Sequence, residues 1–284
     1  MDASVEKSHS AWQPFTPRGV AAFALAPSRR LLLVQLVCAL LAAAAVVGFL
    51  HQSWFPVIEQ AINQLPSEGE IRSQRLSWRG DSPVNLAENR FLAITVDLNH
   101  VGGVRSPAHV QVEFGKTGVK ILSLLGSLEA SYPASWRIAF SRGELVPWWG
   151  AWGPPILAIV AGCVLLWLML SWALLASLYC VPAWLIGFFA NRQLSLRGSW
   201  RLAGAALMPG AMFFTAAVLF YDFGAVDLVR LAAAAAAHFI IGWVYVVASA
   251  LSSTPLTGIV PEKVNPFGRV THEQSQSGEQ TNPE

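Results

Sequence analysis

The chain has 284 residues, of which 54% are hydrophobic and only 13% are charged. A soluble domain of average composition carries about 25% charged residues, and the deficit here is concentrated in long uncharged runs, which is typical of membrane proteins. The net charge of +2 is too close to neutral to indicate a nucleic-acid partner. Cys38, Cys163 and Cys180 lie in or beside apolar runs and match no zinc or redox spacing, so we expect no metal and no cofactor.

The first apolar run predicts transmembrane helix 1 over residues 29–50, preceded by a flexible cytoplasmic tail over residues 1–28. Twenty apolar residues cross about 30 Å of hydrocarbon at 1.5 Å per residue. Arg29 and Arg30 before the run favour an N-terminus on the cytoplasmic side. The same arginines are also typical of a twin-arginine export signal, and residues 42–45 would offer a cleavage site, although a cleaved signal has a shorter apolar region.

Residues 51–153 predict an extracytoplasmic β-rich domain, which begins with a helical extension of the first span that ends before Pro66. Residues 92–98 and 110–114 alternate apolar and polar side chains, as do strands with one covered and one solvent-exposed face. Five strands are expected, over residues 71–78, 91–98, 109–114, 119–125 and 136–140. The candidate core residues of this domain are Trp78, Ile94, Val96, Val112, Phe114 and Ile121.

Residues 154–251 predict a membrane domain that contains transmembrane helices 2–4. The run 154–190 would reach about 55 Å as a helix, which is too long for one crossing and too short for two. We predict one span over about 155–178, and whether the rest continues as one long helix or forms an interfacial segment stays open. Two more spans are expected over 202–221 and 228–251. The polar residues 252–284 predict a disordered cytoplasmic tail.

The predicted fold is therefore an α-helical bundle of four transmembrane helices, with a small β-rich extracytoplasmic domain inserted between helices 1 and 2. Few residues of its spans carry chemistry. His238 is a candidate because ionisable groups at membrane depth are costly and often functional. We expect it to be neutral and to hydrogen-bond across helices to Thr215 or Ser171, holding the spans together. Asp227 and Arg230, three residues apart, predict an interfacial pair on one helix face. No catalytic motif is present in the sequence, so we expect no enzyme.

The last two predicted spans and the loop before them resemble Yip-type membrane cores through Leu194, Trp200-Arg201-Leu202 and residues 205–209. Residues 69–71 and 89–97 are similar to the exported segment of an uncharacterised bacterial multi-pass family that is defined only as a domain of unknown function. In that family a first span precedes a small β-rich exported segment and a cluster of three or more spans. The resemblance implies a bacterial membrane location, but no catalytic residue and no cofactor.

These features favour a non-enzymatic protein of the bacterial cytoplasmic (inner) membrane whose extracytoplasmic domain binds, senses or scaffolds a component of the cell envelope. The expected partners are the lipid bilayer and either an envelope protein or a second copy of the chain. The alternative is a subunit of an oligomeric transporter or channel. Its support is His238, a kink at Pro209 and the small residues of the last two spans. An enzyme acting on lipid ranks third, because the sequence shows no polar cluster at one interface.

The distribution of basic residues predicts that both termini are cytoplasmic and that the β-rich domain lies on the opposite side. Cytoplasmic loops are enriched in Lys and Arg, and Arg192, Arg197 and Arg201 lie between the second and third spans. A compartment-sensitive reporter inserted at residue 110 should therefore report the side opposite to one fused at the C-terminus. Reporters that lie on the same side would show that a span has been miscounted, most directly within 154–190.

Overall fold

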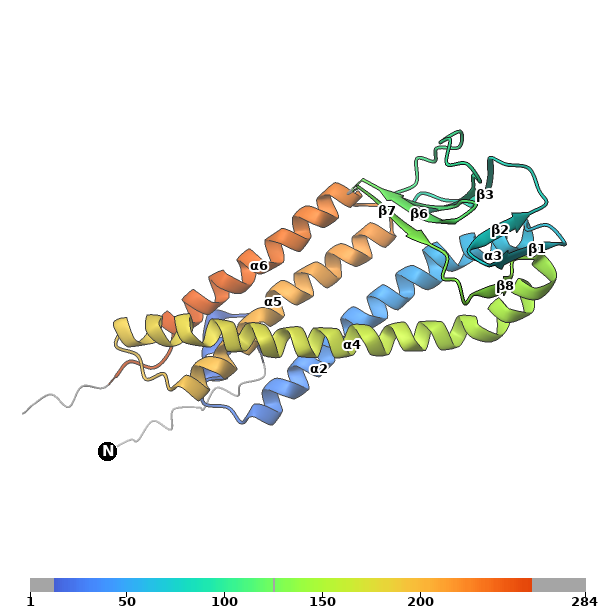
Figure 1. Ribbon diagram of the computed structural model, residues 1–284. Helices are drawn as coiled ribbons and strands as arrows, with labels where there is room; N and C mark the ends of the chain where they lie inside the picture. Colours follow the sequence, from blue (N-terminus) through green and yellow to red (C-terminus); the bar gives the residue numbers. More distant parts are fainter. Residues whose placement is uncertain (1–12, 125, 257–284) are drawn as a thin grey trace, which may run out of the picture.

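Four long helices and eight short strands form the computed structural model, which describes residues 13–124 and 126–256 (Figure 1). By length and composition, all four helices are able to cross a membrane, which confirms the prediction of four long apolar helices and is compatible with a membrane bundle. The first extends from Ser28 to Asn63, because α2 (Ser28–Phe49) continues through the π-helical turn η1 (Leu50–Trp54) into α3 (Phe55–Asn63). The other three are α4 (Arg142–Phe189), α5 (Leu196–Asp222) and α6 (Leu228–Leu251).

A short helix, α1 (Pro17–Ala22), packs against the bundle where we expected a flexible tail over residues 1–28. Thr16 caps it by accepting a hydrogen bond from the Gly19 amide, and Pro17 occupies its first turn. Val20 and Phe23 are fully buried in the apolar cluster of the helices. Burying these side chains requires the segment to fold back onto the bundle, so the described part of the predicted tail belongs to the folded helical domain. The rest of it, residues 1–12, lies outside the described residues.

The run that the sequence left ambiguous is one continuous helix, α4, of 48 residues and therefore about 72 Å. It begins at Arg142, before the predicted boundary at residue 154. Pro154 and Pro155, at the start of the apolar run, lie inside the helix. Proline is tolerated inside membrane helices, where neighbouring groups can satisfy the freed carbonyls, so it is a weak boundary signal here.

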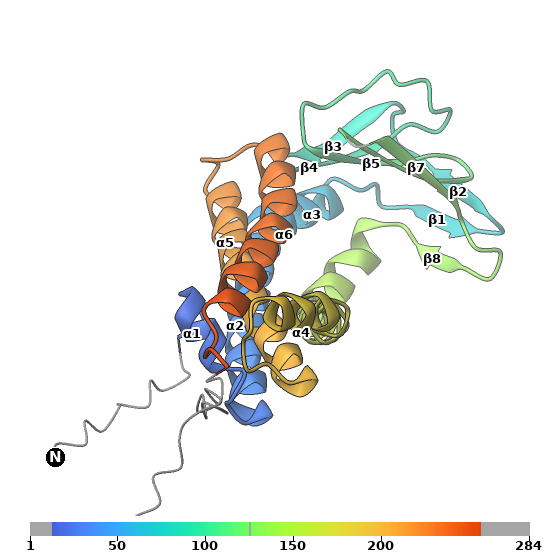
Figure 2. The same cartoon turned by 90° about the vertical axis from the view of Figure 1, so that its left-hand side faces the viewer.

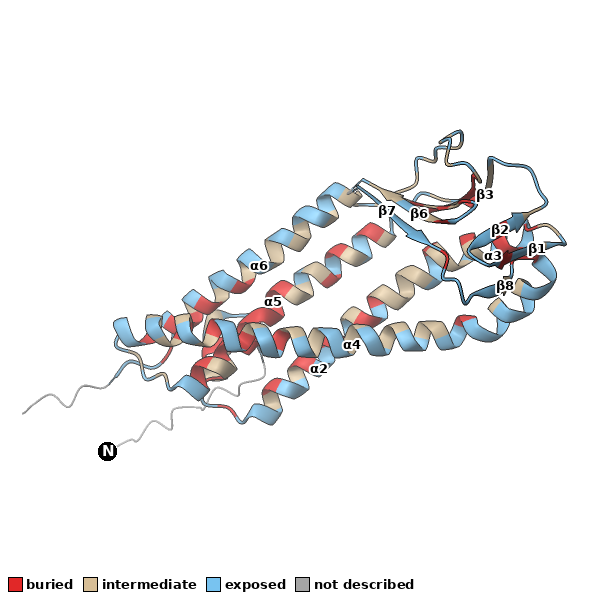
Figure 3. Cartoon of the chain, in the orientation of Figure 1, coloured by how far each residue is buried: buried red, intermediate tan, exposed pale blue. Residues whose placement is uncertain are grey.

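The helices are packed around α5, which is largely buried, whereas α4 and α6 are mostly exposed (Figure 3). Small residues in α5, among them Ala203, Gly204 and Ala206, let the neighbouring helices approach closely. At Gly210, an added Cβ would lie 2.4 Å from the carbonyl oxygen of His238. The contact between α5 and α6 therefore requires glycine at this position.

Both ends of the described chain meet at the end of the bundle remote from the strands (Figure 1). The hydroxyl of Tyr245 in α6 donates to the carbonyl oxygen of Phe15, 2.7 Å away. Arg192, after α4, forms a β-bridge with Pro255 and donates a side-chain hydrogen bond to the Ser253 carbonyl. Residues 253–256 are thus tied to the loop before α5, and the remainder of the predicted disordered tail, from residue 257, lies outside the described residues.

Eight strands between α3 and α4 form two sheets at one end of the helices, to one side of α5 and α6 (Figure 2). In the three-stranded sheet, β1 pairs antiparallel with β2 on one side and with β8 on the other. The five-stranded sheet has the order β3-β4-β5-β6-β7, in which only β4 and β5 are parallel. The strands are β1 (Gly69–Arg72), β2 (Arg75–Trp78), β3 (Val84–Glu88), β4 (Leu92–Val96), β5 (Val110–Phe114), β6 (Gly118–Ser123), β7 (Gly126–Ser131) and β8 (Arg137–Ala139).

The strand predicted over residues 71–78 is a hairpin in the structure. Ser73 and Gln74 have φ values of 49° and 62°, the left-handed conformation that a two-residue turn between β1 and β2 requires. Strand β7 was not expected, because all six of its residues are exposed and no apolar alternation marks it. Strand β3 was also missed, although Leu86 and Ala87 are buried.

The apolar core of the β-rich region lies between the two sheets and α3, where Val57 and Ile71 are buried together. Of the expected core residues, Val96 is fully buried. Four more are partly buried against the same cluster: Trp78, Ile94, Val112 and Phe114. Ile121 was wrongly assigned to the core, because it pairs with Leu128 at the edge of the sheet and both side chains are exposed.

We predict that Gly210→Leu lowers the stability of the helical bundle. The new side chain collides with the backbone of α6, and forced overpacking costs about 1–3 kcal/mol. Gly162→Leu in α4 is the matched control, because nothing lies within 4 Å of a Cβ added there. The thermal unfolding midpoint of the full chain in detergent should fall for the first variant and not for the second; equal midpoints would contradict the close contact at Gly210.

Candidate binding face and its junction with the helices

The β-rich region is joined to the helices by hydrogen bonds at the turn between β3 and β4. The Asn89 side chain accepts from the amides of Phe91 and Leu92, at 2.8 and 2.9 Å, and donates to the Ser53 carbonyl oxygen at 2.5 Å. The Ser53 hydroxyl in turn donates to a carboxylate oxygen of Asp222, 2.8 Å away. One strand turn, the π-helical turn η1 and the end of α5 are thereby connected through two side chains.

A second set of contacts fixes the same turn to the loop between α5 and α6. The guanidinium of Arg90 donates to the carbonyl oxygens of Gly224 and Val226, at 2.8 and 3.4 Å. Gly224 has a φ of +73°, and a Cβ added there would lie 2.7 Å from the Arg90 side chain, so glycine is needed for this approach. His109 Nδ1 lies 2.6 Å from the hydroxyl oxygen of Tyr221, with the two rings stacked.

Aromatic side chains fill the space between these hydrogen bonds. Phe91 of the β-rich region contacts both Phe49 of α2 and Tyr221 of α5, with ring centroids 5.3 and 5.0 Å away, and the other two rings are 5.5 Å from each other. Burial lowers the pKa of His109, and the positive charge of Arg90 lowers it further, while Asp227 opposes both. The imidazole is therefore neutral at physiological pH, which suits its place in an apolar contact.

The polar face of β4 and β5 is covered, although its alternation suggested a solvent-exposed face. The amide of Gln111 donates to the Thr95 hydroxyl and the Val104 carbonyl, at 3.1 and 2.9 Å, and accepts from the Ser106 amide at 3.1 Å. Glu113 is buried and lies 2.5 Å from His100 Nδ1. Residues 98–109 thus form a loop that folds over the sheet and satisfies its buried polar groups.

Asp97 holds the start of this loop. Its two carboxylate oxygens accept from the amides of Asn99 and Gly102, at 3.2 and 2.9 Å. Burial by itself raises the pKa of Asp97, but these backbone hydrogen bonds and the nearby His100 outweigh it, and the net pKa is lowered. The hydrogen bonds of Asp97 and the contact of Glu113 with His100 therefore order the loop. In the described ranges no three His, Cys, Asp or Glu residues are arranged to hold a metal ion.

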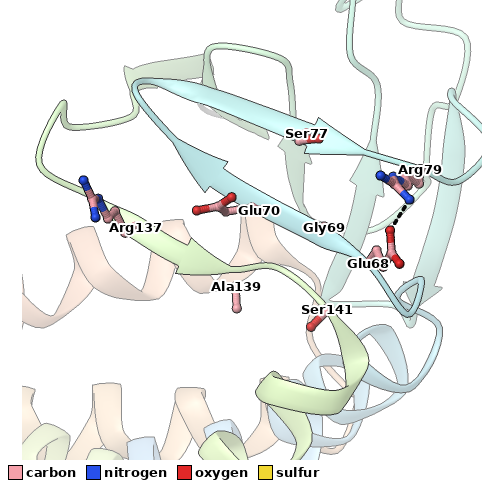
Figure 4. Close-up of a pocket in the computed structure, with 8 residues that line it drawn as sticks. All are labelled: Glu68, Gly69, Glu70, Ser77, Arg79, Arg137, Ala139 and Ser141. Atoms are coloured by element: carbon pink, nitrogen blue, oxygen red, sulfur yellow. Dashed lines mark ion pairs between the residues drawn. The ribbon is translucent and has the colours of Figure 1, made fainter.

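The outer face of the three-stranded sheet forms an open polar hollow of about 530 Å³ (Figure 4). Glu70 on β1 and Ser77 on β2 are direct partners in the register and both line it. Glu68 and Arg79 form an ion pair at one edge, and Arg137 of β8 lies at the other. The hollow presents hydroxyl groups and charges of both signs on three regular strands, an arrangement suited to recognising a polar ligand. It is lined by Glu68, Gly69, Glu70, Ser77, Arg79, Arg137, Ala139 and Ser141.

The three candidate residues of the membrane helices each bond to their own helix. His238 Nδ1 donates to the Ala235 carbonyl, the Thr215 hydroxyl to Ala211 and the Ser171 hydroxyl to Leu168. In the part of the chain that is described, no hydrogen bond joins these three side chains to one another. The expected bond of His238 across helices is therefore replaced by one within α6, beside the ring of Phe214.

Asp227 and Arg230 do form the expected pair, with Arg230 Nε 3.5 Å from a carboxylate oxygen of Asp227. Asp227 also caps α6 by accepting from the Arg230 amide at 2.7 Å. A residue that the sequence reasoning missed is Gln35, which is buried in α2 and donates to the Gly204 carbonyl of α5 at 3.4 Å. The sequence feature that could have identified Gln35 is its polar amide side chain within the apolar run of the first span.

No protein family, curated protein or solved structure matches the chain in comparisons of sequence and structure.

Asn89→Ala should loosen the junction between the β-rich region and the helices. The substitution removes an acceptor for two amides and a donor to Ser53, and leaving buried groups without partners costs about 1–3 kcal/mol. Hydrogen exchange of the Phe91 and Leu92 amides should accelerate in the full chain. The exposed Asn99 provides the control, as Asn99→Ala keeps the amide that bonds to Asp97; unchanged exchange in Asn89→Ala would show that the junction does not depend on this side chain.

Proposed function

We propose that the chain is a non-enzymatic multi-pass protein of the bacterial cytoplasmic membrane that holds a binding domain outside the cytoplasm, in a fixed orientation on its helices. The observation that supports this most is the polar outer face of the three-stranded sheet, carried by a domain that is hydrogen-bonded to η1, to α5 and to the loop between α5 and α6. The partner would be a component of the cell envelope. The Yip-like resemblance is compatible with this proposal and stays a prediction.

The exposed apolar side chains of α4 support a bilayer around the helices. Leu166, Leu170, Leu174 and Leu178 follow one another at four-residue intervals, and each is more than half exposed. Water would disfavour such a stripe, whereas lipid would cover it. Trp148 and Trp152 lie toward the strand end of the same helix, where aromatic rings favour the interface between lipid and water.

The polar groups of the hollow on the three-stranded sheet support a binding role. The polar groups within the helices give less support to transport. Transporters converge several polar groups at the midplane. Here the hydroxyls of Thr215 and Ser171 and the imidazole of His238 are engaged with carbonyls of their own helices. The charged groups of the hollow, by contrast, face solvent on the three-stranded sheet.

A photoreactive amino acid at position 77 tests the proposed function in intact membranes. Ser77 lines the hollow, so a bound partner should give a discrete crosslinked adduct. Position 127 on the exposed strand β7 is the matched control, because Ser127 is also a solvent-exposed strand serine but belongs to the other sheet. Adducts at 77 and none at 127 are expected. No adduct at 77, or the same adducts at both positions, would contradict this binding face.

A further inference from the structure

We propose that Arg72, Arg75 and Arg137, at one end of the outer face of the three-stranded sheet, bind a phosphate group carried by a soluble or polymeric molecule outside the membrane. The inference rests on the proposed function and assigns a ligand chemistry to the same face.

The register of the sheet places the three arginines in one row. Arg72 on the central strand β1 is directly opposite Arg75 on β2 and directly opposite Arg137 on β8. Directly paired residues project from the same face, with neighbouring Cα atoms about 4.5–5.5 Å apart. The adjacent positions Ile71 and Leu76 are buried in the apolar core, so the arginine row lies on the opposite, solvent-facing side, where all three side chains are exposed.

This row carries three positive charges and contains no acidic residue. Within the described residues, none of the three guanidiniums has a carboxylate at ion-pair distance, and Glu68 on the same face is engaged by Arg79. Like charges directly opposite one another destabilise a sheet. The β1–β2 turn would be more stable with one of the arginines replaced, so the row is explained better by binding than by folding.

Phosphate matches the row better than a carboxylate does. One arginine satisfies a carboxylate through two parallel hydrogen bonds, which would leave the other two guanidiniums without a partner. A phosphate ester offers three acceptor oxygens and a charge of about −1.5 to −2. Arginine side chains are long enough for those of the outer strands to converge over Arg72, so one phosphate could contact all three.

The position of the sheet favours a molecule away from the lipid headgroups. Strands β1, β2 and β8 lie beside α3 and the first turns of α4, at the end of the molecule remote from α1 (Figure 1). If Trp152 marks the interface, α4 rises about 15 Å from there to Arg142, shortly after Arg137. A lipid headgroup of the same bilayer would have to extend about 15 Å above the interface to reach the arginines. A soluble phosphate ester or a phosphate-bearing polymer reaches them directly.

Glu70 places a negative charge beside the arginine row, and removing that charge should change the affinity for phosphate. It lies two residues before Arg72 on the same strand and the same face, and its carboxylate makes no ion pair with any described residue (Figure 4). Its negative charge should repel a bound phosphate. Glu70→Gln should therefore tighten phosphate binding, by about two- to fivefold for a partly screened pair at the surface.

The test measures binding of defined probes to the full chain in nanodiscs of zwitterionic lipid. The probes are inorganic phosphate, short-chain polyphosphate and vesicles with or without anionic phospholipid. We expect calorimetric binding of polyphosphate, with weaker binding of inorganic phosphate, and a loss of about tenfold or more in the triple variant R72Q/R75Q/R137Q. R72K/R75K/R137K, which keeps the charge but not the paired donors, should lose most of the affinity.

Arg105→Gln, an exposed arginine on the loop over the other sheet, is the control and should bind as the parent does. An equal loss in Arg105→Gln, or full affinity in either triple variant, would overturn the site. Binding only to anionic vesicles would overturn the assignment to a molecule away from the bilayer, and binding of no probe would overturn the phosphate assignment. If position 77 still gives its adduct in that case, the proposed function stands and this inference alone fails. The triple glutamine variant should be at least as heat-stable as the parent, which separates lost binding from misfolding.

Discussion

Polar groups that leave water must find partners, and this constraint fixes the β-rich region onto the helices. Asn89 uses both ends of its amide, accepting from the amides of the β3–β4 turn and donating to Ser53. Ser53 passes the connection to Asp222 at the end of α5. Because Asn89 is fixed at both ends, a tilt of the domain would break hydrogen bonds on each side of the junction. The position of the five-stranded sheet, which contains β3 and β4, depends on this chain of contacts.

A different constraint orders the helices. Between apolar helices in lipid there is little hydrophobic gain, so close backbone packing and hydrogen bonds have to hold them. Gly210 brings α5 against the backbone of α6, and Gln35 bonds to α5 from α2. These contacts make α5 the common neighbour, while the outer surfaces of α4 and α6 are left for lipid. The same helix carries Tyr221 and Asp222, so the packing of α5 also positions the junction.

Much of this fold could be predicted from the sequence because long apolar runs and capping residues are local signals. The span over 228–251 agrees with α6, and its paired Asp227 and Arg230 are three residues apart. Strands β4 and β5 were predicted from their alternation of apolar and polar residues, whereas β7, which buries nothing, gave no signal. The contact of Arg90 with Gly224 joins residues 134 positions apart, and no periodicity reports such a contact.

His238 shows why a correct chemical expectation can give a wrong partner. A neutral histidine in an apolar helix does need a hydrogen bond, and the sequence suggested hydroxyl groups on other helices. The carbonyl of Ala235, one turn earlier, is already within reach, so the local bond forms and no second helix is needed.

The arginine row could not be predicted from the local sequence. Each arginine is an ordinary residue of an exposed strand, and only the register of the sheet places three like charges side by side. Arg72 and Arg75 flank a two-residue turn, and Arg137 belongs to a strand more than sixty residues later. Local choices in a natural sequence normally agree with the fold, and disagreements concentrate at functional sites. A carboxylate on β8 opposite Arg72 would neutralise the charge of the two arginines that flank the turn. The residue at that position is instead Arg137, a third arginine. The three arginines form no ion pair within the described residues, and a bound anion would neutralise their positive charge.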